Sequence, residues 1–276
     1  YIDNYCGAHG LIDTLFVETQ NQNSLETINN YGRLISMKNT ATKTRNDLVQ
    51  LSSSVELIQP SLTMSNEDLR GLDYQSGGNN DPPLTDKSCS FNPYCCINRT
   101  QQDIPFSKTG AVKINMILAR VSDFLHGQNL PNFATATYSI RNLRLRFKTV
   151  PTQNQNDPIL LNVVYNIKNS VNSQFININA KVPSVVKSVN ASFMRQGSEG
   201  SLPLNTKAQE ILPNLQTVQF YFNDAVSGQG VTYTIENINE MVKRYLESWG
   251  SSSGSQVTEK KYDSLNAFGI GSNFGA

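Results

Sequence analysis

The feature that most limits how this chain can fold is an internal repeat. Residues 11–17 have the two-residue period of a half-buried strand, and after a polar turn residues 26–35 place apolar side chains at helical spacing. Residues 215–222 and 233–242 repeat this order of strand, polar connection and isoleucine-led helix. The strands are 204 positions apart (215 − 11) and the leading isoleucines 207 positions apart (235 − 28), so the copies stay nearly in step. The repeat predicts two successive domains of similar construction.

A pair of alternating strands is predicted in the middle of the chain. Residues 111–119 alternate apolar and polar side chains, which is the pattern of a strand with one buried face. Residues 138–147 are predicted to form a second strand of this kind, since apolar side chains alternate there with Arg144 and Arg146. We expect these two strands to belong to one β-domain.

The boundary between the two domains is predicted at Pro151. Proline cannot donate to a strand ladder, and residues 152–158 consist of Thr, Gln, Asn, Asp and Pro, which is typical of a linker. We therefore predict a first domain over residues 1–150 and a second over residues 151–276. When the two copies are aligned, the first lacks the N-terminal strands of the predicted domain and the second lacks its C-terminal strands. We expect the natural polypeptide to be longer for that reason.

The remaining segments complete a β-rich pattern. Charged residues make up only 16% of the chain and polar uncharged ones are plentiful, which suits antiparallel sheets with polar outer faces. The predicted fold class is all-β with short inserted helices. Further strands are predicted over residues 91–97, 159–167, 175–182, 185–194, 217–222 and 231–235, helices over residues 25–38, 47–57 and 236–249, and a long surface loop over residues 64–88.

Charge and hydropathy argue against two classes of function. The chain carries 23 basic and 22 acidic residues, so its net charge of +1 gives no global attraction to polyanions. We expect no specific nucleic-acid binding. The longest apolar runs fall far short of the roughly 20 residues that span a bilayer.

The side chains that could carry out chemistry form no recognisable site in the sequence. His9 and His126 lie in no nucleophile motif, so a structural role is predicted for both. With only two histidines available, the cysteines lack the spacing of a zinc site and are predicted to be buried free thiols. We predict no catalytic, cofactor-binding or metal-binding residues and no cofactor. The four cysteines are Cys6, Cys89, Cys95 and Cys96.

Three further motifs have both a functional and a structural interpretation. Asn98 and Asn190 begin glycosylation sequons, which arise often by chance in an Asn-rich chain. Trp249 with Tyr245 could stack on a sugar, but helical spacing within an apolar stripe favours a core position. A group of basic residues could face a genome or an inner membrane, although alternating strand positions favour a solvated or intersubunit face. This group is Arg141, Arg144, Arg146 and Lys148.

Several segments resemble one family of structural proteins. They are residues 7–13, 27–37, 94–98, 104–114, 124–127, 138–151, 218–222 and 239–249. Two consecutive β-rich units, each with a helix after an early strand, are similar to the double jelly-roll major capsid proteins of virophages and polinton-like viruses. The chain departs from that family because neither unit has room for all eight strands of a jelly roll.

The resemblance implies a tandem double jelly roll with a structural, non-enzymatic role. It implies homotrimers of pseudo-hexagonal outline that tile an icosahedral shell, with neighbouring capsomers, penton proteins and minor capsid proteins as further partners. The protein would belong to the virion and assemble inside the host cell. Two alternatives stay open: a β-sandwich carbohydrate-binding or adhesin module, and a single jelly-roll vertex (penton) protein, which the repeat disfavours.

Overall fold

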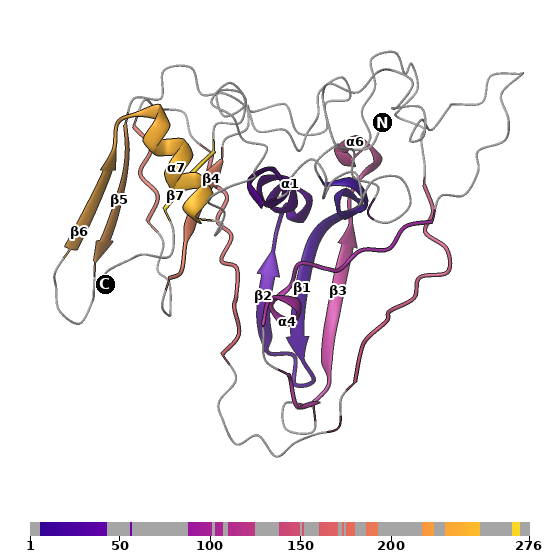
Figure 1. Ribbon diagram of the computed structural model, residues 1–276. Helices are drawn as coiled ribbons and strands as arrows, with labels where there is room; N and C mark the ends of the chain where they lie inside the picture. Colours follow the sequence, from indigo (N-terminus) through magenta and orange to yellow (C-terminus); the bar gives the residue numbers. More distant parts are fainter. Residues whose placement is uncertain are drawn as a thin grey trace, which may run out of the picture.

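The computed structural model describes residues 6–42, 56, 88–100, 103–106, 110–124, 138–149, 151, 160–170, 173, 175–179, 186–192, 217–223, 230–248 and 267–270. Within these residues small antiparallel sheets are accompanied by short helices, in agreement with the predicted β-rich class (Figure 1). In chain order the elements are η1 (Gly7–Leu11), β1 (Ile12–Thr19), β2 (Ser24–Ile28), α1 (Tyr31–Thr42), α4 (Cys96–Arg99), β3 (Val112–Leu118), α6 (Val121–Phe124), β4 (Val189–Ser192), β5 (Val218–Asn223), β6 (Gly230–Ile235), α7 (Ile238–Ser248) and β7 (Ala267–Ile270).

The largest sheet has three strands in the order β2-β1-β3, all antiparallel. Leu15 of β1 pairs with Ile28 of β2 on one side and with Met116 of β3 on the other. The predicted strand over residues 111–119 is confirmed as β3, and the one over residues 11–17 as β1. The buried face expected of β3 ends before Leu118, which is in phase with the half-buried Ile114 and Met116 but is 48% exposed.

The predicted helix over residues 25–38 is wrong at its start. Residues 24–28 form β2, a hairpin partner of β1, and the helix α1 begins only at Tyr31. Apolar side chains three apart, such as Ile28 and Tyr31, fit a helical stripe, but here the first ends a strand and the second begins a helix. Both side chains are fully buried, so the same burial is reached through two different backbones.

A single apolar core joins this sheet to the elements around it. Leu15, Val17, Ile28, Tyr31 and Ile35 are buried on its inner side, together with three of the cysteines. Full burial of each large apolar side chain stabilises the fold by about 1.5 to 3 kcal/mol. The sheet and α1 are therefore held by one hydrophobic cluster.

The second half of the chain repeats the hairpin and helix of the first. β5 and β6 pair antiparallel, with Val218 opposite Ile235, and α7 follows β6. The predicted strands over residues 217–222 and 231–235 and the helix over residues 236–249 are confirmed within their described parts. A further pair, β4 with β7, packs on α7.

The predicted repeat is present as hairpin, two-residue connection and helix in both halves. Ile28 and Ile235 each end the second strand of the hairpin, and an asparagine, Asn30 or Asn237, immediately precedes each helix. The backbone carbonyl of Asn30 accepts from Leu34 N–H, and that of Asn237 accepts from Met241 N–H, at positions 207 apart. The correction concerns Ile28, which lies in β2, although the predicted helix over residues 25–38 included it. Ile235 lies in the strand that was predicted over residues 231–235.

The two repeated helices contact each other. The Tyr245 hydroxyl of α7 donates to the Met37 carbonyl of α1 at 2.9 Å, and Tyr245 is fully buried. In the view of Figure 1 the three-stranded sheet and the β5–β6 hairpin stand on opposite sides of this helix pair. Equivalent elements of the two copies thus meet at their junction.

Four segments predicted as strands are not strands over their described residues. Residues 91–95 are irregular and lead into α4, while residues 138–149, 160–170 and 175–179 have no regular secondary structure. The predicted strand over residues 185–194 is reduced to β4. Alternation alone does not make a strand, because the backbone N–H and C=O groups need a ladder partner, and these segments have none among the described residues.

Several predictions fall outside the described residues. They are the helix over residues 47–57 except Glu56, the loop over residues 64–88 except its last residue, the linker over residues 152–158, and the side chains of His126 and Trp249.

Candidate functional site

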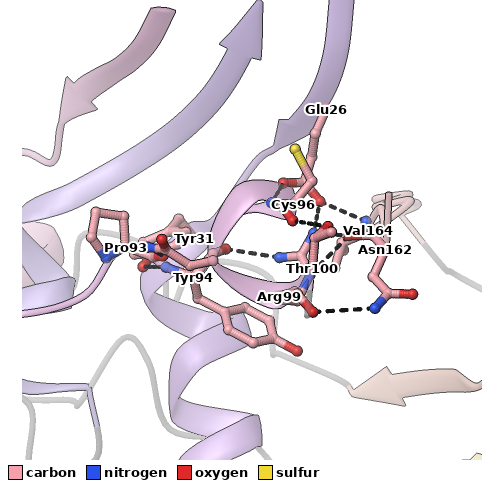
Figure 2. Close-up of polar contacts among 10 residues, drawn as sticks. Glu26, Tyr31, Pro93, Tyr94, Cys96, Arg99, Thr100, Asn162 and Val164 are labelled. Atoms are coloured by element: carbon pink, nitrogen blue, oxygen red, sulfur yellow. Dashed lines mark hydrogen bonds and ion pairs between the residues drawn. The ribbon is translucent and has the colours of Figure 1, made fainter. Parts of the chain in front are cut away.

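A buried carboxylate, Glu26, lies at the centre of the most highly connected polar cluster in the described chain (Figure 2). Its Oε2 accepts from the Cys96 backbone N–H at 2.7 Å, and its Oε1 accepts from the Val164 backbone N–H at 2.6 Å. The Arg99 guanidinium donates to the same Oε1 and forms an ion pair with it. The Glu26 side chain is 0% exposed, and its charge is therefore compensated entirely by protein groups.

The cation of this pair, Arg99, uses all three guanidinium nitrogens. Nε and Nη2 donate to the Asn162 carbonyl at 3.1 and 2.8 Å, and Nη1 donates to the Tyr94 carbonyl at 2.9 Å. The guanidinium also stacks over the Tyr94 ring, 4.6 Å from the centroid. A planar donor with several N–H groups suits this geometry in a way that an ammonium would not.

The cluster joins three stretches that are far apart in the chain. Glu26 lies in β2, Arg99 in α4, and Asn162 and Val164 belong to the predicted second domain. The side-chain amide Nδ2 of Asn162 donates to the Arg99 backbone carbonyl at 3.2 Å. The Oδ1 of the same side chain accepts from the Lys187 ammonium at 2.7 Å. We call Glu26, Arg99 and Asn162 the clasp. It ties residues 160–166 to the edge of β2.

The sequence pattern did not reveal the clasp, although one signal was available. Glu26 and Ile28 are both buried in β2 while Thr27 between them is exposed, so the glutamate lies on the core face of the strand. A charge on a core face requires a buried partner. The predicted helix over residues 25–38 concealed this alternation, and Arg99, 73 positions away, carries no local mark of its role.

A second buried polar group surrounds Tyr31. Its hydroxyl accepts from the Tyr94 backbone N–H at 2.7 Å and lies 2.9 Å from Nδ1 of His9. The tautomer of the imidazole sets which of these two groups donates to the other. The other ring nitrogen, Nε2, lies 3.8 Å from Glu56 Oε2. Burial raises the pKa of Tyr31 well above its usual range, so the phenol stays protonated.

His9 is buried among aromatic side chains of the first unit. The imidazole is 4% exposed and also packs against the Phe91 ring, 4.7 Å between centroids. No nucleophilic hydroxyl or thiol is hydrogen-bonded to it among the contacts of the described residues. The hydroxyl it contacts is that of Tyr31, whose raised pKa argues against a phenolate nucleophile.

The prediction of buried free thiols is confirmed for three cysteines and wrong for one. Cys6, Cys95 and Cys96 are buried and Cys89 is exposed, and none of the four forms a disulfide. Burial, followed by the nearby Glu26 carboxylate, raises the pKa of Cys96 to about 12. The protonated thiol is a poor nucleophile and metal ligand, so Cys96 acts as a core residue at neutral pH.

Both sequon asparagines have intramolecular partners. Asn98 in α4 donates from its amide to the Pro93 carbonyl at 2.6 Å, and Asn190 in β4 accepts from the Ser248 hydroxyl. Of the sugar-stacking pair, Tyr245 is a core residue, as the helical spacing indicated. The basic residues Arg141, Arg144, Arg146 and Lys148 are all exposed.

The described residues assemble no group of three or more histidine, cysteine, aspartate or glutamate side chains that could hold a metal ion. Across the same residues, every helix is too short or too polar to traverse a bilayer. The clasp leaves its carboxylate and guanidinium saturated with protein partners, and its chemistry is that of a structural joint.

Comparisons of the chain with protein-family models, with curated proteins and with solved structures found no match.

Proposed function

We propose that this chain is a major capsid protein, a structural subunit that self-assembles as a pseudo-hexagonal homotrimer and tiles an icosahedral shell. Each half would belong to one jelly roll of a tandem pair. The observation that carries the proposal is the repeated hairpin and helix, β1-β2-α1 and β5-β6-α7, with the two helices in contact through Tyr245. Duplicated units packed side by side are what a two-domain capsomer wall requires.

Exposed apolar side chains supply a second line of support. Leu143, Leu145 and Phe147 are 84%, 69% and 77% exposed, and Phe175 is 90% exposed. Exposed apolar side chains that are gathered in this way mark surfaces that become covered in an assembly. Obligate oligomers bury such surface extensively between subunits.

The experiment is a measurement of mass and shape in solution. We expect purified chain to give about three times the monomer mass of 30.6 kDa by light scattering, and negative-stain images to show sheets or shells built of three-fold particles. The variant Leu145→Asp should shift the particle to monomer without lowering the unfolding temperature, because the side chain is largely exposed in the single chain. Asn142→Asp, on the same segment, is the charge-matched control. A wild-type monomer at all concentrations contradicts the proposal.

A carbohydrate-binding module is the second candidate, and one observation favours it. A cavity of about 300 Å³ is lined by amides, hydroxyls, one aromatic ring and two isoleucines, Ile176 and Ile178. The other five side chains of its lining are suited to a sugar. These are Asn169, Ser170, Ser173, Phe175 and Asn177. A glycan array with a specific hit that Phe175→Ala abolishes, together with a monomeric protein, would establish this candidate in place of the capsid proposal.

A further inference from the structure

Residues 138–149 carry the densest positive charge in the chain. They include Arg141, Arg144, Arg146 and Lys148, and no acidic residue occurs anywhere from position 124 to position 156. Without these four, the 23 basic residues of the chain become 19 against 22 acidic ones. The overall balance of +1 therefore hides a local concentration of positive charge in a remainder that is slightly acidic.

These four cations are available to a ligand. All are exposed, and none has an ion-pair partner within the described parts of the chain. The contrast is with Arg99, whose guanidinium is saturated by Glu26 and by backbone carbonyls, and with Arg244 of α7, which pairs with Glu240. Arg99 and Arg244 are thus engaged within the protein, whereas the four cations of this segment are exposed to solvent.

The order of side chains separates charge from apolar surface. Leu143, Leu145 and Phe147 alternate with Arg144, Arg146 and Lys148. In an extended chain alternate side chains lie on opposite faces, so covering the apolar row leaves the three cations in a line on the other face. Two-residue steps place neighbouring cations about 6.6 Å apart, close to twice the roughly 3.4 Å axial spacing of phosphates along one strand of DNA.

We propose that this basic row, Arg144, Arg146 and Lys148 with Arg141 beside it, binds the phosphate backbone of a nucleic-acid strand without reading its bases. The guanidinium and ammonium N–H groups donate to phosphate oxygens, and association releases condensed counterions. The inference rests on the proposed function only for the source of that strand, a packaged genome. It leaves the expected lack of sequence-specific binding intact.

A linear polyanion fits the row better than an anionic membrane does. Basic segments that bind membrane surfaces place apolar side chains beside the charges, so that both reach the headgroup region. In an extended segment the leucines and Phe147 point away from the cations, and the two rows cannot meet one flat surface together. The test must therefore distinguish binding to a nucleic-acid strand from binding to an anionic membrane.

The test is a titration of a fluorescein-labelled oligothymidylate, followed by anisotropy at several salt concentrations. We expect wild-type chain to bind, with affinity that falls steeply as salt rises. Arg144→Gln/Arg146→Gln/Lys148→Gln should weaken binding at least tenfold at low salt and lower the slope of log K against log salt by about 0.7 for each cation removed. Replacing both arginines by lysine should retain most of the binding.

The matched control removes three exposed cations elsewhere, Lys113→Gln/Lys168→Gln/Lys243→Gln, and should bind like wild type. Equal losses in the control and in the basic-row variant overturn the inference, as does wild type that shows no salt-dependent binding. A strong preference for oligothymidylate over oligoadenylate overturns it too, because the backbone is common to both. Binding confined to phosphatidylserine vesicles assigns the row to a membrane instead.

Light scattering on the same samples separates this inference from the proposed function. A trimer that does not bind the oligonucleotide refutes the basic row and leaves the capsid proposal standing. A monomer that binds the oligonucleotide, with weaker binding only in the basic-row variant, refutes the capsid proposal and leaves the basic row standing. Circular dichroism should be unchanged in every variant, since the substituted side chains are exposed.

Discussion

The hairpin and helix of the first half and those of the second have the same local plan but different surroundings. β1-β2-α1 gains a third strand, the short helix α4 and the clasp on its edge, whereas the described part of β5-β6 is a two-stranded sheet whose Tyr221 is 65% exposed. The buried ion pair occurs in the first unit, and the charges of α7 are exposed. Similar local sequence thus specifies similar elements, while stability depends on what packs around them. An isolated two-stranded ribbon is marginal in water.

The largest difference between the units should appear when one arginine is removed from each. Arg99→Ala leaves the Glu26 carboxylate buried without its cation, and we expect the free energy of unfolding to fall by about 3 to 5 kcal/mol. Arg244→Ala removes an exposed helix pair and should change it by about 0 to 1 kcal/mol. Urea denaturation measures both. Equal shifts in the two variants would mean that the clasp contributes no more than a surface pair.

The two buried helix tyrosines offer a smaller comparison. Tyr31→Phe leaves both the Tyr94 N–H and His9 Nδ1 without their partner, so a loss of about 2 to 3 kcal/mol is expected. Tyr245→Phe removes the bond to the Met37 carbonyl, and about 1 kcal/mol should be lost. Thermal unfolding of the pair tests this order. If Tyr245→Phe is the more damaging, the contact between the two helices matters more than the polar group around His9.

Alkaline pH should destabilise the first unit through Cys96. Its pKa is raised to about 12 from the ordinary 9.0, so above pH 9 the unfolded chain releases this proton and the folded chain keeps it. The free energy of unfolding should therefore fall by up to about 1.4 kcal/mol per pH unit from pH 9 up to about pH 12, with stability fully present below pH 9. Cys96→Ala should reduce that slope when unfolding is followed across the range. An unchanged slope would assign the effect to other groups.

The smallest effects are expected at the asparagines that precede the helices. Asn237 Oδ1 accepts from the Asn239 N–H at 2.8 Å, so Asn237→Ala should lower the free energy of unfolding by about 1 kcal/mol. Asn30 has φ +50°, a left-handed conformation, and Asn30→Gly should be neutral or slightly stabilising. Helix content and unfolding temperature report both. A loss at Asn30→Gly as large as that at Asn237→Ala would show that the asparagine side chain is needed at both positions.

The elements that were predicted correctly from the sequence are those whose apolar periodicity is complete within a few consecutive residues. β1, β3, β5, β6 and α7 each show their period over a few residues. The segment over residues 138–147 shows an equally clear alternation, yet it forms no strand in the described structure. Periodicity states which side chains can share a face; it does not supply the neighbouring strand.

The sequence by itself determined the duplicated plan of strand, turn and helix, because propensity, turn residues and apolar spacing act over only a few residues. Only the tertiary structure decided that Glu26 is buried, that Arg99 and Asn162 close over it, and that the helices α1 and α7 meet. These contacts join residues 63 to 208 positions apart. Their partners are chosen by packing and by the need to compensate a buried charge, and no local pattern records that choice.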